Sequence, residues 1–394
     1  MQAEATLCLP AKASGTGRFL GGVLVYKADM MVSSAGVPRS TDGALPERIA
    51  VLGGGGFLGS HLTAALLDQG AQVVVLDRSL GKLGRDTTDN PRLRCVAGSV
   101  DDGALLETSL DGCDAVVSMT ALCNPSLYNT VPQDVIRANF LDLLPLVDLC
   151  SRKGCWLVHL STCEVYGRGD PSAFLREDST PLVLGPVQSE RWSYACAKQL
   201  LERWIWAQGI HGTLPFTIVR PFNIIGPRMD YLPGIDGEGV PRVLACFMAA
   251  LLRQEPLPLV DGGQQRRAFA SVRDFCDAML AILRTPGRCQ GQIFNVGNAD
   301  NDISISELAR HMVAVYAERH GGDPTLPCQP VSAQSYYGTG YDDVARRIPD
   351  LAYVEARVGW RARISLAEML PEIVDDYVAR YRNRVGSPQV AVTR

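Results

Sequence analysis

From Arg48 onward, short apolar runs rich in β-branched residues alternate with stretches whose apolar residues recur at helical spacing. The predicted strands are Ile49–Leu52, Gln72–Leu76, Leu93–Ala97, Ala115–Met119, Cys155–Leu160 and Phe216–Val219. The predicted helices are Leu58–Gln69, Gln133–Lys153, Arg191–Gln208, Pro241–Arg253 and Ile305–Ala317. This alternation indicates βαβ units, so we expect an α/β fold with a Rossmann-type doubly wound parallel sheet.

Changes in the sequence pattern along the chain also predict its division into domains. Residues 48–226 are predicted to form the sheet domain, with later segments at about 265–297 returning to it. Residues 227–264 and 298–394 then form a smaller C-terminal lobe that binds the substrate at the carboxyl edge of the sheet. Residues 1–47, rich in Gly, Ser, Ala and Pro, are predicted to be a disordered extension.

Composition narrows the function classes. The chain has 394 residues, 46% of them hydrophobic, and a formal charge of -4, which argues against a disordered chain and against a nucleic-acid partner. The apolar run Phe19–Tyr26 is too short to span a bilayer, so no membrane partner is expected. Twelve scattered cysteines without a C-x-x-C pair favour a reduced, cytoplasmic protein, and five histidines outside ligand spacing give no support for a metal site.

The string GGGGFLG follows the first predicted strand and begins a helix, as in a dinucleotide-binding turn. Glycines let the backbone approach a pyrophosphate, which then lies at the helix N-terminus. The cofactor-binding residues expected from this string are Gly53, Gly56, Phe57, Leu58 and Gly59. Asp77, at the end of the second strand, can accept hydrogen bonds from ribose hydroxyls and favours NAD. Arg78 beside it could bind a 2'-phosphate, so NADP stays an alternative.

Tyr194 and Lys198 are four residues apart in RWSYACAKQL and therefore share one helix face. A phenol has a pKa of about 10 and needs a nearby ammonium to act as a base near neutrality. Such a pair alone is more often a surface feature. Downstream of a dinucleotide turn and of STCEVYG, it resembles the Tyr-Lys pair of short-chain dehydrogenases.

The order of GGGGFLG, STCEVYG, RWSYACAKQLLER, FTIVRPFNIIGPRMD, LVDGGQQRRAF and GYDDVARRIPD resembles the extended short-chain dehydrogenases that act on UDP-glucuronic acid, roughly from Arg48 to Tyr381. RWSYACAKQL, GIDGEGVPRVLACF and STCEVYG are most similar to the UDP-apiose/UDP-xylose synthase family. The bacterial UDP-glucuronic acid decarboxylases of lipid A aminoarabinose synthesis are similar too. The resemblance implies NAD as cofactor, UDP-glucuronic acid as substrate and a homodimer.

The resemblance also implies roles for single residues. Tyr194 would take the proton of the sugar's 4-hydroxyl, Thr162 would hydrogen-bond this hydroxyl, and Lys198 would hold the nicotinamide ribose and lower the tyrosine pKa. The product of oxidation is a β-keto acid, which loses its carboxylate readily. Glu164 matches a family glutamate that handles a proton or positions a water.

Arg347 matches the arginine that binds the substrate carboxylate, and Asp343 would orient it. The substrate-binding residues that we expect are Arg191, Asn223, Gln265, Arg267, Tyr341 and Arg347. Pro258 and Ile224 differ from the lysine and tryptophan of the relatives, so contacts on the nucleotide side are altered. Ser99 likewise replaces an aspartate that is common near the adenine.

Cys123 and Cys163 match the thiol pair of UDP-apiose/UDP-xylose synthases. Either cysteine alone would more often be a small buried hydrophobic residue, but two cysteines at loop ends on the carboxyl edge of the sheet favour a chemical role. With the thiols active, oxidation and decarboxylation would be followed by a ring-contracting rearrangement and reduction to UDP-apiose and/or UDP-xylose. Without them, a decarboxylase would give UDP-xylose or a UDP-4-keto-pentose. A related nucleotide-sugar epimerase or dehydratase and an NAD-sensing regulatory protein remain as alternatives.

The predicted helices Gln133–Lys153 and Arg191–Gln208 carry more apolar residues than one buried face requires. The residues in question are Leu143, Leu146, Leu200, Leu201, Trp204 and Ile205. In the similar family such helices pair across a two-fold axis, which predicts a homodimer.

Overall fold

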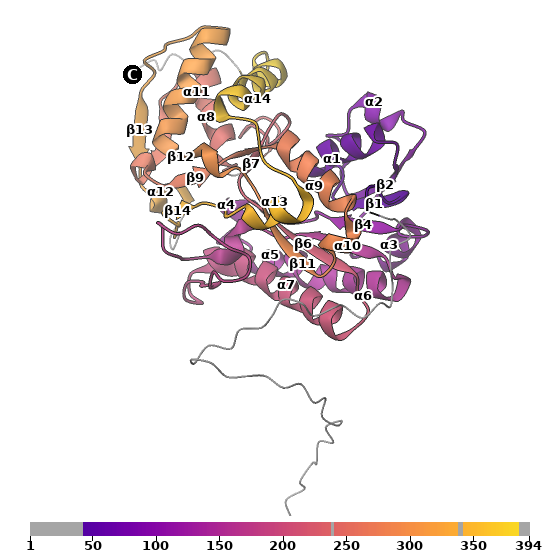
Figure 1. The fold of residues 1–394 in the computed structure, drawn as a ribbon. Coiled ribbons are helices and arrows are strands. Elements are labelled where there is room, and N and C mark those ends of the chain that lie inside the picture. Colours follow the sequence, from indigo (N-terminus) through magenta and orange to yellow (C-terminus); the bar gives the residue numbers. More distant parts are fainter. Residues whose placement is uncertain (1–41, 238–239, 338–341, 386–394) are drawn as a thin grey trace, which may run out of the picture. The chain divides into compact units, whose positions relative to one another are not determined.

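A seven-stranded parallel sheet is the central element of the computed structural model, which describes residues 42–237, 240–337 and 342–385 (Figure 1). Its order is β11-β6-β5-β4-β1-β2-β3. The strands are β1 (Arg48–Leu52), β2 (Gln72–Asp77), β3 (Leu93–Ala97), β4 (Ala115–Ser118), β5 (Trp156–Leu160), β6 (Phe216–Pro221) and β11 (Gln292–Val296). The expected doubly wound α/β fold is confirmed, and the strand β11, which was not predicted, pairs with β6.

Alternate side chains of the strands enter two separate cores. In β1, Ile49 and Val51 enter the first core, and Ala50 and Leu52 enter the second. The first is covered by α1 (Phe57–Asp68) and α9 (Val272–Leu283), and the second by α3 (Gly103–Ser109), α6 (Leu144–Lys153) and α7 (Ser193–His211). Both faces of the sheet are therefore buried along its inner strands, which explains the apolar runs of β1, β4 and β5. The edge strand β3 has exposed residues on both sides.

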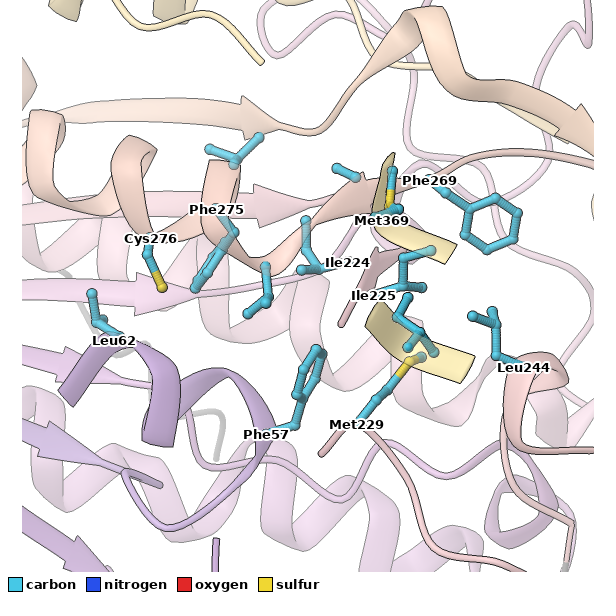
Figure 2. Close-up of a cluster of buried hydrophobic side chains, with 14 of the residues drawn as sticks. Phe57, Leu62, Ile224, Ile225, Met229, Leu244, Phe269, Phe275, Cys276 and Met369 are labelled. Carbon is cyan, nitrogen blue, oxygen red and sulfur yellow. The ribbon is translucent and has the colours of Figure 1, made fainter. Parts of the chain in front are cut away.

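The first core continues beyond the sheet into a group of helices and short strands. The larger members are α8 (Val243–Arg253), α11 (Ile305–His320) and α14 (Leu366–Tyr381). Figure 2 shows Phe57 of α1, Ile225, Met229, Leu244 of α8 and Met369 of α14 gathered in one apolar layer. This packing fixes the C-terminal elements against α1, next to the carboxyl edge of the sheet.

Short strands build three small sheets in this group. They pair as β10-β7, β12-β9-β14 and β13-β8. Their bounds are β7 (Ile224–Ile225), β8 (Leu257–Val260), β9 (Arg266–Ala268), β10 (Ala270–Ser271), β12 (Asp302–Ser304), β13 (Cys328–Val331) and β14 (Arg346–Arg347). The remaining helices are α2 (Arg85–Thr88), α4 (Pro125–Tyr128), α5 (Pro132–Asn139), α10 (Pro286–Cys289), α12 (Ala333–Tyr337) and α13 (Ala352–Val358).

The predicted continuous helix Gln133–Lys153 is wrong, because the chain breaks it into α5, a 3-10 turn and α6. Phe140 at the break has φ -138° and ψ -67°, outside the helical region. Pro145 at the start of α6 has no amide hydrogen to continue an earlier helix. The helical spacing of apolar residues continues across the break, so the sequence pattern did not reveal it.

The predicted extension 1–47 lies mostly outside the described residues. Its last part is described and is bonded to the fold, since Gly43 N donates to Arg284 O at 2.7 Å and Asp42 Oδ1 accepts from Gly287 N at 3.0 Å. Within the described ranges, no helix is both long and apolar enough to cross a membrane. The same residues contain no group of three His, Cys, Asp or Glu side chains placed to hold a metal ion.

Candidate active site

The glycine string forms a tight turn between β1 and α1. Gly53 has φ +83°, in the region that favours glycine. A Cβ atom on Gly59 would lie 2.1 Å from Gly53 O, and one on Gly55 would lie 1.9 Å from Ser79 O. Gly55 was not among the predicted residues, although it stands in the same string. The turn therefore has room only for backbone, which leaves the amide groups at the start of α1 accessible to a diphosphate.

Asp77 ends β2 beside this turn. Its Oδ2 accepts a hydrogen bond from Gly55 N at 3.0 Å, and its Oδ1 accepts one from Ser79 N at 3.1 Å. Each carboxylate oxygen has a second lone pair, so both can still accept from a ribose hydroxyl. Of the other residues predicted in the turn, Phe57 is buried in the core and Leu58 lines the neighbouring cavity.

A cavity of about 310 Å³ opens at the carboxyl ends of β4, β5 and β6. Most of the predicted site residues line it. These are Leu58, Cys123, Thr162, Cys163, Glu164, Arg191, Tyr194, Lys198, Asn223, Gln265, Arg267, Asp343 and Arg347. Tyr341 lies outside the described residues. The fold thus brings together side chains that lie more than two hundred positions apart in the sequence.

Tyr194 and Lys198 lie on the first turns of α7, and both are buried. Lys198 Nζ donates to Leu160 O at 3.0 Å, and burial lowers the pKa of this lysine to about 8. Burial, Cys123 and Glu164 raise the pKa of Tyr194, while its hydrogen bond with Thr162 acts in the opposite direction. The tyrosine therefore needs positive charge nearby to act as a base.

The ring of Tyr194 stacks on that of Tyr128, with the centroids 5.1 Å apart and the planes 8° from parallel. Tyr128 ends the short helix α4 and is buried. Sequence reasoning missed it, because no spacing rule links a tyrosine before α5 with one in α7. The stack fixes the plane of the Tyr194 ring.

Glu164 lies between two buried arginines. Its Oε2 accepts from Arg191 Nη1 at 2.7 Å, and its Oε1 accepts from Arg347 Nη1 at 3.0 Å. Burial alone would raise the pKa of Glu164, but the two guanidinium groups outweigh burial and hold this pKa well below its usual range. Glu164 is therefore a carboxylate at neutral pH, which can accept a hydrogen bond but is a poor proton donor.

Asp343 extends this pattern to a third arginine. Its Oδ1 accepts from Arg267 Nη2 at 2.6 Å and lies 3.8 Å from Arg347 Nη2. Arg267 and Arg347 face each other in register on β9 and β14. We call the five residues Arg191, Glu164, Arg347, Asp343 and Arg267 the arginine–carboxylate chain.

The arginine–carboxylate chain holds three guanidinium groups and two carboxylates, so it carries one surplus positive charge in the cavity wall. Arg347 is 4% exposed, and its Nε has no hydrogen-bond partner among the described residues. A buried guanidinium edge without a partner is costly unless a ligand satisfies it. This wall therefore suits an anionic group of a ligand.

The two cysteines lie in different surroundings. Cys163 is buried, with Sγ 3.9 Å from Arg347 Nη1; burial raises the pKa of this thiol and Arg347 acts in the opposite direction. Cys123 is exposed and precedes α4. Both line the cavity with Tyr194, so both thiols can reach a ligand there.

On the other side of the cavity, Asn223 Nδ2 donates to Ala268 O at 3.2 Å, and Gln265 Nε2 donates to Val260 O at 3.3 Å. Asn223 has φ +40°, an unusual value for a residue with a side chain. Ile224 and Pro258, the two positions that depart from the similar families, also line this region. The side-chain amide oxygens of Asn223 and Gln265, together with the apolar side chains of Ile224 and Pro258, form a surface suited to a nucleotide.

Comparison with known proteins agrees with this geometry. Residues 49–297 match the model of the NAD dependent epimerase/dehydratase family. The UDP-D-apiose/UDP-D-xylose synthase 1 of Arabidopsis thaliana is 43% identical over 82% of this chain and 90% of its own length. The UDP-D-apiose/UDP-D-xylose synthase of Oryza sativa subsp. japonica is 44% identical over 82% of this chain and 87% of its own length.

Among solved structures, the PbgP3 protein from Burkholderia pseudomallei superposes with a TM-score of 0.75 at 32% identity, over 86% of this chain and 98% of that protein. The resemblance predicted from the motifs is thereby confirmed at the level of sequence and of fold.

Proposed function

Because the chain belongs to the NAD dependent epimerase/dehydratase family, we propose that it oxidises carbon 4 of UDP-glucuronic acid, decarboxylates the product, and rearranges and reduces it to UDP-apiose and/or UDP-xylose. One observation carries the proposal. The arginine–carboxylate chain, with its surplus positive charge, lines the same cavity as Tyr194, Lys198 and both thiols. A hexuronic acid is a sugar that brings a carboxylate and an oxidisable hydroxyl to one site.

The glycine turn and Asp77 fit NAD as the cofactor. Gly53, Gly55 and Gly59 leave backbone-only space at the start of α1, and Asp77 would repel the 2'-phosphate of NADP. Ser161 supports the fit, because its Oγ is buried, finds no partner in the described part of the chain, and belongs to a residue that lines the cavity. NAD, when bound, supplies the hydride acceptor for the oxidation and the hydride donor for the final reduction.

Tyr194 takes the proton of the 4-hydroxyl in this proposal. The Lys198 ammonium favours the phenolate, and Thr162, hydrogen-bonded to Tyr194, is placed to hold the same hydroxyl. Tyr128 keeps the phenol ring in one plane. These residues give oxidation at carbon 4, which turns the substrate into a β-keto acid.

Arg347 binds the substrate carboxylate in this proposal, with its Nε, which has no partner among the described residues, available for the hydrogen bond. Because Glu164 is held as a carboxylate, it acts as a hydrogen-bond acceptor that positions Arg347 or a water, and another group must return a proton after carbon dioxide leaves. Cys163, next to Arg347, and Cys123 would move protons while the bond between carbons 2 and 3 opens and the branched pentose closes.

Incubation of the purified protein with UDP-glucuronic acid and NAD, followed by NMR of the products, tests the proposal. We expect carbon dioxide, UDP-apiose and UDP-xylose, without stoichiometric NADH. A UDP-4-keto-pentose with one NADH per turnover would instead support the decarboxylase alternative. No release of carbon dioxide would contradict both.

A further inference from the structure

Two consecutive aspartates, Asp342 and Asp343, bind two different groups of residues. Asp343 belongs to the arginine–carboxylate chain and contacts Arg267 and Arg347. Asp342 accepts a hydrogen bond from Trp192 Nε1 at 3.2 Å and one from Arg168 Nε at 3.0 Å. The short segment between these aspartates and β14 is therefore anchored both to the cavity wall and to the start of α7.

Trp192 is held from several sides. It is 4% exposed and packs with Ala195 of α7 and Val344 of the anchored segment. A Cβ atom on Gly185 would lie 2.2 Å from Trp192 Nε1, so the backbone of loop 168–189 fits closely against the indole. The indole nitrogen is thereby aimed at Asp342, its hydrogen-bond acceptor.

Two arginines lie on the indole ring. The guanidinium carbon of Arg191 is 4.7 Å from the ring centroid, and that of Arg168 is 5.9 Å from it. Arg191 in turn binds Glu164, and Arg168 binds Asp342. Trp192 is thus connected to Arg347 in two ways. One connection runs through Arg191 and Glu164, and the other runs through Asp342 and its neighbour Asp343.

The hydrogen bond between Trp192 and Asp342 joins two parts of the chain 150 residues apart. On one side, Tyr194 follows Trp192 by two positions; on the other, Arg347 follows Asp342 by five. In the proposed reaction these two groups act on the same sugar ring, Tyr194 at the 4-hydroxyl and Arg347 at the carboxylate. Their separation must match the distance between the two substituents.

We infer that Trp192 and Asp342 form a positioning pair, which holds Arg347 and Asp343 in register with Tyr194. Neither residue lines the cavity, so they act through the residues beside them. The inference rests on the proposed function, because it supposes one ligand that reaches both Tyr194 and Arg347. A displacement of about 1 Å between these groups is enough to slow a positioned reaction about a hundredfold.

Trp192→Phe and Asp342→Leu test the pair from its two sides. Phenylalanine keeps an aromatic ring near both arginines but loses the indole N–H and part of the packing volume. The Asp342 change removes the same hydrogen bond at a partly exposed side chain outside the core, where packing is not altered. Asp342→Asn keeps an acceptor for Trp192 and removes the charge that pairs with Arg168. The readouts are kcat and KM for decarboxylation, binding of NAD, UDP and UDP-glucuronic acid by calorimetry, and Tm.

Arg168→Ala removes one contact of the pair, and Arg176→Ala is its matched control. Both arginines lie in loop 168–189, with side chains 51% and 58% exposed, and each pairs with an aspartate that flanks β14. Arg176 pairs with Asp350 at 3.5 Å, on the far side of the strand from Asp342. Of these two arginines, Arg168 contacts the positioning pair and Arg176 pairs with Asp350 instead, so Arg176→Ala should leave kcat unchanged.

We expect Trp192→Phe and Asp342→Leu to lower kcat about tenfold or more, while NAD and UDP binding change less than about twofold. Asp342→Asn should regain most of the lost turnover. UDP-glucuronic acid should lose more affinity than UDP, because only the acid engages Arg347. Unchanged kcat in both variants, or a loss that follows Tm and NAD binding in parallel, would overturn the inference.

The wild-type protein separates this inference from the proposed function. If it binds UDP-glucuronic acid without turnover, the proposed reaction is wrong. The affinities of the variants for UDP-glucuronic acid and for UDP then still test whether Trp192 and Asp342 position Arg347. If it binds neither ligand, both proposals are wrong.

Discussion

The hydroxyl group of Tyr194 is the most direct point at which to test the chemistry. Tyr194→Phe removes this hydroxyl and leaves the ring stacked on Tyr128. A positioned acid or base contributes about 10²–10⁴-fold, so we expect oxidation to fall to background while NAD still binds. Turnover and NAD affinity measured on the same preparation check this. Turnover above a few per cent of wild type would show that another group is the base.

Lys198 gives turnover a pH dependence. Burial lowers its pKa to about 8, so the ammonium is present at pH 7 and is lost as the pH rises through about 8. Because the ammonium favours the Tyr194 phenolate, kcat should fall on the alkaline side of this value. A pH profile at saturating substrate and NAD measures the fall. Arginine keeps its charge in this range, so the residual activity of Lys198→Arg should lack the alkaline limb. An identical limb in that variant would assign it to another group.

Arg347→Ala should raise KM for UDP-glucuronic acid and slow decarboxylation. The lost charge-assisted hydrogen bond corresponds to about 1.5–3 kcal/mol of binding free energy. Arg346→Ala is the matched control, because Arg346 is the neighbour of Arg347 in β14 but binds Asp302, outside the cavity. Steady-state kinetics on both variants measure the difference. Equal losses in the two variants would indicate damage to β14 rather than loss of a carboxylate contact.

The two thiols separate the synthase from the decarboxylase. A cysteine has a pKa of about 8.5 and exchanges a proton far more easily than serine does. If Cys123 and Cys163 serve only the rearrangement, serine at either position should suppress the branched product much more than decarboxylation, and UDP-xylose or the 4-keto pentose should accumulate. Cys196→Ser, at an exposed position of α7 outside the cavity, is the control. A wild-type product ratio in both serine variants would leave the cysteines as packing residues.

At the scale of elements, the turn between β1 and α1 has the strictest backbone requirement. Gly55→Ala would place a methyl group 1.9 Å from Ser79 O, so the loop after β2 must move away from the turn. We expect NAD affinity to fall by about tenfold or more, since the amides of the turn lose their arrangement. Gly84→Ala is the control, because Gly84 has an ordinary φ of -69° and open space around it. Calorimetric titration with NAD compares them, and equal affinities would contradict the assignment of the turn.

Element length explains how far the sequence could predict the fold. The first six strands of the large sheet, most of which contain apolar runs, were all predicted to within two residues at their ends. The strands β9 and β14 have three and two residues, too few for any periodicity to appear. Arg267 and Arg347, which these strands place in the cavity wall, were therefore found through motif resemblance rather than through pattern. The ion pair between Glu164 and Arg347 spans 183 positions and follows only from tertiary structure.

At the scale of the whole molecule, the remaining question is what covers the outer faces of α5 and α7. Of the six apolar residues that suggested a second buried face, four enter the core beneath the sheet: Leu143, Leu146, Leu201 and Ile205. Leu200 and Trp204 of α7 do not, with 46% and 41% of their surface exposed. Ile136 of α5 and Leu141 just after it are exposed by 39% and 47%. α5 packs against α7, and Figure 1 shows the two helices on the same side of the sheet.

These exposed side chains predict a homodimer in which α5 and α7 pair with the same helices of a second copy. Burial of apolar surface contributes about 25 cal/mol per Å², so an acidic residue in the centre of such a face should be strongly unfavourable to association. Leu200→Glu with Trp204→Glu should convert a dimer to a monomer at micromolar concentration in light scattering. Phe174→Glu, which changes a similarly exposed residue (51%) that belongs to neither helix, should leave the dimer intact. A monomeric wild-type protein would contradict the prediction, and the exposed residues of α5 and α7 would then belong to another contact.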